Sequence, residues 1–129
     1  MATLHMTEAS LQEAVASLAH VYRWRVAHFR AAVTGKGFRT PVAYDGKGFP
    51  DLILVRRPFV LAVELKADAG FLDDDQERWC NAFANGVVPY DVWTPREFAD
   101  GTIARVLKDG PPPNVREFIA YAATKGTPT

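Results

Sequence analysis

The stretch GFPDLILVRRPFVLAVELK, residues 48–66, limits most strongly what this chain can fold into. Two runs rich in Val, Leu and Ile flank an Arg-Arg-Pro turn, which is the pattern of a buried β-hairpin. However, the first run opens with Asp51, and the second ends with Glu64 and Lys66. Three charged side chains at one end of an apolar hairpin mark that end as a candidate functional site.

The expected register of the hairpin brings two of these charges face to face. Side chains alternate between the faces of a strand, so Glu64 and Lys66 share one face. If the turn is centred between Arg57 and Pro58, Asp51 falls opposite Glu64, with their Cβ atoms about 5 Å apart. A wider turn that shifts the register by two residues keeps Asp51 on the same face.

Two carboxylates at this separation repel each other, and a divalent cation removes the conflict. Mg²⁺ prefers oxygen ligands and commonly takes one or two carboxylates, leaving water and substrate phosphate at its other positions. Lys66 would then either stabilise a pentacovalent phosphate or help to deprotonate the attacking water. Taken singly, a Glu-x-Lys segment is usually a solvated ion pair and Pro-Asp usually starts a turn. Their combination in a compatible register favours a site for phosphodiester hydrolysis.

Two helices are expected to add polar groups at the same place. Glu8 lies three residues before Leu11 on an apolar stripe, so it faces inward where the first helix starts. Gln76 lies three and four residues before Trp79 and Cys80 and faces the core side of the second helix. Each residue also has a purely structural interpretation. Glu8 would interact favourably with the dipole of the helix as an acid in its first turn, and Gln76 would be a capping or rim residue.

The pattern along the chain predicts an α/β fold, with helices flanking a mixed central sheet. One domain is expected over residues 1–129, with a core at about 7–109 and a tail at 124–129. Its elements are expected in the order α-β-β-β-α-β followed by helices, at 7–22, 24–30, 51–55, 60–66, 72–86, 88–94, 95–98 and 115–123. The glycine-rich segment between 34 and 48 is expected to be a loop.

Composition excludes several classes of protein. A single cysteine, Cys80, rules out a disulfide framework or a thiolate zinc site within the chain, and a buried structural thiol is expected. No signal peptide or membrane span is apparent, so a cytoplasmic protein of the bacterial cytosol is expected. No nucleotide-binding glycine loop or nucleophile elbow occurs, and no organic cofactor is expected.

The segments GFPDL, AVELK and DDQERW, after a helix that starts TEASLQEAV, resemble the PD-(D/E)XK nuclease superfamily. More narrowly they resemble the stand-alone VRR-NUC nucleases of phages and bacteria, which are similar to Holliday-junction resolvases. The resemblance covers roughly residues 7–94 and implies a restriction-endonuclease-like core. The chain departs from many relatives at Tyr22 and Arg23, where these have a glycine-containing turn.

The resemblance implies an endodeoxyribonuclease that depends on Mg²⁺ or Mn²⁺ and acts in DNA replication, recombination or repair. The catalytic residues that it implies are Glu8, Asp51, Glu64, Lys66 and Gln76. The metal ligands that it implies are Asp51, Glu64, the backbone carbonyl of Leu65 and, as a further candidate, Glu8. It also implies a branched DNA substrate, such as a four-way junction, and a homodimer.

A local excess of basic residues fits a DNA partner, although the formal net charge of the chain is zero. From His20 to Lys66 there are nine Lys and Arg residues against three Asp and Glu residues. The candidate DNA contacts are Arg25, His28, Arg30, Lys36, Arg39 and Lys47. His28 has two interpretations, a satisfied sheet residue or a contact to the scissile phosphate.

Other readings of the chain remain open. It could be a nucleic-acid-binding module that keeps the nuclease fold without activity, or a nicking or flap nuclease without selectivity for junctions. The complete set of Glu8, Asp51, Glu64 and Lys66 argues against an inactive module.

Four phenylalanines in loops or at element ends support the expected homodimer, because they indicate apolar surface that a monomer would struggle to bury: Phe38, Phe49, Phe59 and Phe71.

Overall fold

The computed structural model describes residues 6–29, 32–34, 37–39, 43–68 and 70–112, with backbone alone for 32–34 and 37–39. Its elements are α1 (Glu8–Val21), β1 (Arg25–His28), β2 (Ala32–Thr34), β3 (Gly37–Arg39), β4 (Leu52–Arg56), β5 (Phe59–Leu65), α2 (Asp74–Phe83), β6 (Tyr90–Trp93), α3 (Pro95–Ala99) and α4 (Thr102–Asp109). Among these residues no helix is long and apolar enough to cross a membrane.

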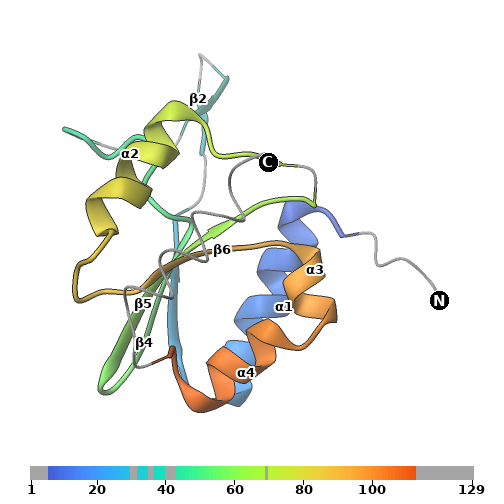
Figure 1. The fold of residues 1–129 in the computed structure, drawn as a ribbon. Coiled ribbons are helices and arrows are strands. Elements are labelled where there is room, and N and C mark those ends of the chain that lie inside the picture. The colour runs from blue at the N-terminus through green and yellow to red at the C-terminus, as the bar shows by residue number, and fades with distance from the viewer. Residues whose placement is uncertain (1–5, 30–31, 35–36, 40–42, 69, 113–129) are drawn as a thin grey trace.

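A four-stranded mixed sheet in the order β1-β4-β5-β6 forms the middle layer of the fold. Strand β4 pairs antiparallel with both β1 and β5, whereas β5 and β6 are parallel. Helix α2 lies on one side of this sheet, and α1, α3 and α4 lie on the other (Figure 1). The predicted α/β class, with helices flanking a mixed sheet, is therefore confirmed.

The sheet faces are buried unequally, because three helices cover one of them and a single helix covers the other. The larger core joins the apolar stripe of α1 to the sheet and α4; its buried members include Leu11, Val15, Leu54, Leu61, Val63, Trp93, Ile103 and Leu107. The smaller core, under α2, is formed by Ala62, Cys80, Tyr90 and Val92. Cys80 is a buried free thiol, as predicted, and burial raises its pKa.

The turn between α1 and β1 holds a non-glycine residue in a conformation that favours glycine. Tyr22 caps α1, and Arg23 follows with a φ of 69°, in the left-handed region. This is the place where the sequence departs from the glycine-containing turn that the family resemblance implies. The turn nevertheless closes, because the backbone N–H of Trp24 donates to the carbonyl of Ala19 at 2.9 Å.

Arg56 ties the β4–β5 hairpin to the helical layer. Its guanidinium donates to the backbone carbonyls of Tyr22, Leu107 and Lys108 at 3.1, 2.8 and 3.1 Å. It also lies 4.9 Å from the ring centroid of Trp24. These contacts place a cation at the carboxyl end of α4, where exposed carbonyls favour positive charge.

Two predictions about the elements were incomplete. Part of the segment expected to be a loop forms the β2–β3 hairpin, and α4 occupies residues that were assigned no element. The apolar residues of α4, Ile103, Val106 and Leu107, face the core at helical spacing. The short helix near Pro95 is confirmed as α3. The helix expected at 115–123 and the tail at 124–129 lie outside the described residues.

The prediction of apolar surface at four phenylalanines was largely wrong. Phe49 packs edge-on against Phe29 and Trp79, and Phe59 packs against Trp24. Phe71 alone of the three with described side chains is markedly exposed, at 57%. The side chain of Phe38 is not described.

Candidate active site

The β4–β5 register brings the predicted pair of carboxylates together. Leu52 pairs with Val63, and the same register continued by one residue places Asp51 opposite Glu64. Oδ2 of Asp51 accepts a hydrogen bond from the backbone N–H of Leu65 at 2.9 Å. Asp51 thus lies opposite Glu64, as the sequence predicted for a turn centred between Arg57 and Pro58, and a backbone donor fixes it there.

The proline before Asp51 changes the hydrogen bonding of Leu65. Continuing the register by two residues places Pro50 opposite Leu65, and proline has no N–H to donate. The N–H and C=O of one strand residue point toward the same neighbour. The carbonyl of Leu65 therefore points toward the strand that contains Asp51. The residue opposite it there, Pro50, has no N–H that could donate a hydrogen bond to this carbonyl. This makes a backbone oxygen at the carboxylate pair a candidate ligand, as the family resemblance implies.

Glu64 is the most unusual group of the site. It lies at the end of β5 and is only 2% exposed. Its Oε2 accepts a hydrogen bond from Nε2 of Gln76 at 3.1 Å. Its Oε1 is buried and has no hydrogen-bond partner among the described residues. A buried polar atom without a partner is costly, so such an atom calls for an explanation.

The electrostatics of Glu64 reflect this environment. Burial first, and then the negative charge of the nearby Asp51, raise the pKa of Glu64 to about 10. The positive charge of Lys66 lowers the pKa of Glu64, and the charge of Glu8 raises it. Four of the predicted charged residues therefore act on one another here.

Glu8 and Lys66 reach the site from different elements. Glu8 is in the first turn of α1, at the end of the stripe whose buried members are Leu11, Val15 and Ala19. Its own side chain is exposed, so the prediction that Glu8 faces inward was wrong as to burial, although its charge acts on Glu64. Lys66 follows β5 directly and is half-buried, and its N–H donates to the carbonyl of Trp93 at 3.0 Å.

Gln76 combines the two roles that the sequence left open. It is the third residue of α2, and it forms a capping box with Asp73. Its Oε1 accepts from the N–H of Asp73 at 2.9 Å, while its Nε2 donates to Glu64. The same amide therefore caps the helix and contacts the buried carboxylate.

The donor set fits a hard divalent cation that keeps water ligands. No group of three or more His, Cys, Asp and Glu side chains in the described part of the chain is arranged to hold a metal ion. However, Mg²⁺ commonly uses one or two carboxylates and completes its shell with water. The carboxylates of Asp51 and Glu64, with the unpartnered Oε1 and the Leu65 carbonyl, supply oxygen ligands only. A cation there would remove both the repulsion and the unsatisfied oxygen.

The predicted basic contacts are scattered over the molecule. Arg25 and His28 are exposed at opposite ends of β1 and face opposite sides of the sheet. His28 pairs with Leu52, next to Asp51, whereas Arg25 pairs with Val55 near the far turn. Of the others, Arg30 and Lys36 lie outside the described residues, and Arg39 lies in β3 with its side chain undescribed. Lys47 is exposed and forms an ion pair with Asp75 at 3.4 Å.

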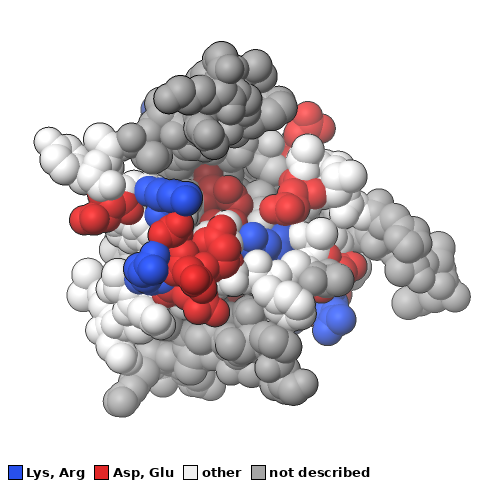
Figure 2. Space-filling view, turned by 90° about the horizontal axis from the view of Figure 1, so that it is seen from above, with Lys and Arg blue, Asp and Glu red and all other residues white. Residues whose placement is uncertain are grey.

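Acidic side chains dominate the end of the molecule at which α2 begins. Seen from above, Asp and Glu side chains gather over the middle of this face, with Lys and Arg side chains among them (Figure 2). Asp73, Asp74, Asp75 and Glu77 all belong to the start of α2. A phosphate group approaching this face meets repulsion unless cations are present, which is a second reason to expect a metal ion.

Sequence reasoning missed the loop at 43–50 as a partner of α2. A cavity of about 570 Å³ lies between them, lined by Tyr44, Asp45, Lys47, Asp75, Arg78, Trp79 and Ala82. The indole N–H of Trp79 donates to the carbonyl of Asp45 at 2.9 Å. The only signal in the sequence was the composition of the loop, whose glycines permit close approach to a helix.

Comparison with known proteins gives no match to a protein-family model or to a curated protein.

Proposed function

We propose that this chain is an endodeoxyribonuclease that requires Mg²⁺ or Mn²⁺ and hydrolyses phosphodiester bonds of DNA. The observation that carries the proposal is the buried Glu64 carboxyl group opposite Asp51, with one oxygen that has no hydrogen-bond partner in the described part of the chain and with Lys66 beside it. Two carboxyl groups this close either share a proton or bind a cation, and the buried oxygen without a described partner favours the cation.

Each residue has a role in this proposal. Asp51, Glu64 and the Leu65 carbonyl are the groups that hold the ion, with Glu8 close enough for its charge to act on Glu64. When bound, the ion polarises the scissile phosphate and makes a bound water more acidic. Lys66 carries the positive charge that either stabilises the extra negative charge of the pentacovalent phosphate or assists deprotonation of the water.

The substrate is proposed to be branched DNA, such as a Holliday junction, and the active form a homodimer. The resemblance to the PD-(D/E)XK superfamily and to the stand-alone VRR-NUC nucleases supports both statements. A junction presents two symmetric positions for cleavage, and a two-fold dimer presents two sites related by the same symmetry. The exposed His28 pairs with Leu52, the residue after Asp51, and its side chain lies on the sheet face opposite to that of Glu64.

The test is a panel of end-labelled DNAs, comprising a four-way junction, a flap, a nicked duplex, a linear duplex and a single strand. Each is incubated with the protein in Mg²⁺, in Mn²⁺ and in EDTA. We expect metal-dependent cleavage that is strongest on the junction, and no cleavage by Asp51→Asn or Glu64→Gln, although both still bind DNA. Cleavage in EDTA or by either variant would reject the site. Binding without cleavage by the wild-type protein would indicate a non-catalytic module, and equal cutting of nicks or flaps would remove the junction selectivity.

A further inference from the structure

The first turn of α2 joins a helix cap to the buried carboxylate through one side chain. The N–H of Gln76 donates to Oδ1 of Asp73 at 2.8 Å, and the N–H of Asp73 donates to Oε1 of Gln76 at 2.9 Å. The remaining end of the amide, Nε2, donates to Oε2 of Glu64 at 3.1 Å. Asp73 and Glu64 are therefore linked by a continuous chain of hydrogen bonds.

The chemistry of the amide explains why a glutamine occupies this position. Glutamate or glutamine can complete a capping box at the third helical residue. Only the amide also has a donor, because an ionised carboxylate accepts hydrogen bonds and cannot donate them. Since the Asp73 N–H occupies Oε1 of Gln76, the orientation of the amide is fixed and Nε2 is directed to Glu64.

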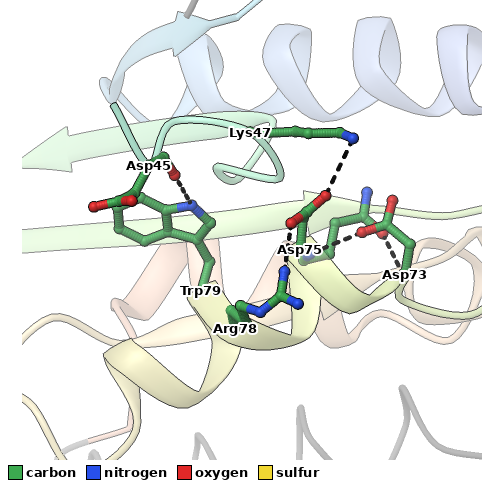
Figure 3. A network of polar contacts seen from close by, with 7 residues as sticks. Asp45, Lys47, Asp73, Asp75, Arg78 and Trp79 are labelled. Carbon is green, nitrogen blue, oxygen red and sulfur yellow. Dashed lines mark hydrogen bonds and ion pairs between the residues drawn. The ribbon is translucent and has the colours of Figure 1, made fainter. Parts of the chain in front are cut away.

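The loop before Asp51 holds the same turn of α2 from the other side (Figure 3). Gly48 has a φ of +84°, and a Cβ there would lie 2.5 Å from the backbone carbon of Asp75 and 2.7 Å from the nitrogen of Gln76. Lys47 pairs with Asp75, and Trp79 donates to the carbonyl of Asp45. The start of α2 is thus fixed against the segment that leads into Asp51.

We propose that Asp73 is a positioning residue of the metal site. Its backbone N–H orients the amide of Gln76, and its side chain fixes the backbone N–H of Gln76, so that the turn carrying the amide is held in place. The amide holds Oε2 of Glu64, and Oε1 of Glu64 is left for the cation. This inference rests on the proposed function, because it assumes that Asp51 and Glu64 bind a divalent metal. It adds a residue that makes no contact with metal or DNA, and it explains why the buried carboxylate has one satisfied and one unsatisfied oxygen.

The test measures Mn²⁺ binding by calorimetry, without DNA, together with thermal melting. Asp73→Gly removes the acceptor of the Gln76 backbone N–H and so loosens the turn that carries the amide, although glycine is a tolerated N-cap. We expect its Mn²⁺ affinity to fall about 10-fold, as for other partners that orient metal ligands. Asp73→Asn keeps the cap and should restore the affinity. Asp74→Gly is the matched control, because it removes an equal charge from the exposed adjacent position.

A double variant separates positioning from a general effect on the fold. If Asp73 acts through the amide, Asp73→Gly adds no loss of Mn²⁺ affinity when Gln76 is already replaced by alanine. Additive losses, or equal losses for Asp73→Gly and Asp74→Gly, would overturn the inference while leaving the metal site intact. Failure of the wild-type protein to bind Mn²⁺, or unchanged binding by Glu64→Gln, would overturn the proposed metal site and this inference with it.

Discussion

Glu64 sits where an ionised carboxylate is least stable, between the sheet and α2. Burying a charge without a counter-charge is costly, and proteins respond by shifting the pKa or by supplying a cation. Gln76 satisfies one oxygen and Lys66 supplies a nearby positive charge, but Asp51 opposes ionisation. The metal-free protein therefore holds this carboxyl protonated, and the proposed cation would reverse the balance.

This balance predicts how the stability of the metal-free protein depends on pH. The folded-state pKa of Glu64 is about 10, far above its ordinary value of 4.5. A raised folded pKa stabilises the fold fully below pH 4.5, and this contribution is lost as pH rises toward 10. In EDTA, the melting temperature should therefore fall between pH 5 and pH 9.

Two comparisons check this pH dependence. Glu64→Gln should have a flatter profile than the wild-type protein, whereas Glu13→Gln should keep the wild-type slope. Mg²⁺ should raise the wild-type melting temperature more at pH 9 than at pH 6, because metal binding requires the ionised carboxylate. Identical slopes for wild type and Glu64→Gln would contradict the assignment.

Two acids of α1 provide a second test at the same scale. Glu8 acts electrostatically on Glu64, whereas Glu13 is exposed and faces away from the buried stripe of α1. If Glu8 contributes to the metal site, Glu8→Gln should lower the rate of DNA cleavage about 100-fold, the usual effect of removing a preorganised electrostatic group. Glu13→Gln should leave the rate unchanged. Similar rates for the two variants would remove Glu8 from the site.

At the level of elements, the sequence predicted best where apolar periodicity was strong. The alternation along β4 and β5 predicted both the hairpin and the pairing that sets Asp51 opposite Glu64. The β2–β3 hairpin was missed because each strand has three residues and the segment is rich in glycine and threonine. Helix α4 was missed despite a clear signal, Ile103, Val106 and Leu107 between two glycines. The helix has only eight residues, so the apolar periodicity extends over about two turns and is a weak signal.

The site was predictable in its members but not in its hydrogen bonds. Strand alternation and helical phase identified Asp51, Glu64 and Gln76 as neighbours. No periodic pattern reports which oxygen of Glu64 lacks a partner or that one amide serves both a cap and a carboxylate. Those features depend on the spacing between elements to within a few tenths of an ångström. Similarly, the left-handed Arg23 follows from the closure of the helix–strand turn and not from its own preference.

Arg56 allows a test of how the hairpin is attached to the helices. It makes three hydrogen bonds to backbone carbonyls and stacks on Trp24. Arg56→Ala should lower the free energy of unfolding by about 2–3 kcal/mol, because charged hydrogen bonds of this kind are lost together. Arg57→Ala, in the exposed turn, should change it by less than about 0.5 kcal/mol. Urea unfolding followed by circular dichroism measures both, and equal effects would show that Arg56 does not anchor the hairpin.

At the scale of the whole molecule, α2 leaves part of its sheet face uncovered. Val55 and Val60 are cross-strand partners near the hairpin turn, on the face that holds Ala62 and Glu64. They are 38% and 39% exposed, on the part of the sheet remote from the carboxylates. Two adjacent exposed valines on a sheet face are a candidate contact between two copies of the chain.

We therefore expect a homodimer whose two-fold axis passes near this pair of valines. A single site in a 14.3 kDa chain makes one nick, whereas the proposed junction substrate needs two symmetric nicks. Light scattering on a sizing column should give twice the chain mass for the wild-type protein. Val55→Lys combined with Val60→Lys should give a monomer that keeps its fold and its Mn²⁺ binding, since the substitutions lie away from Asp51 and Glu64. Val87→Lys, at a far more exposed position outside the sheet, is the control and should remain dimeric. A wild-type protein that stays monomeric at tens of micromolar, with and without junction DNA, would contradict the dimer and favour a nicking or flap nuclease.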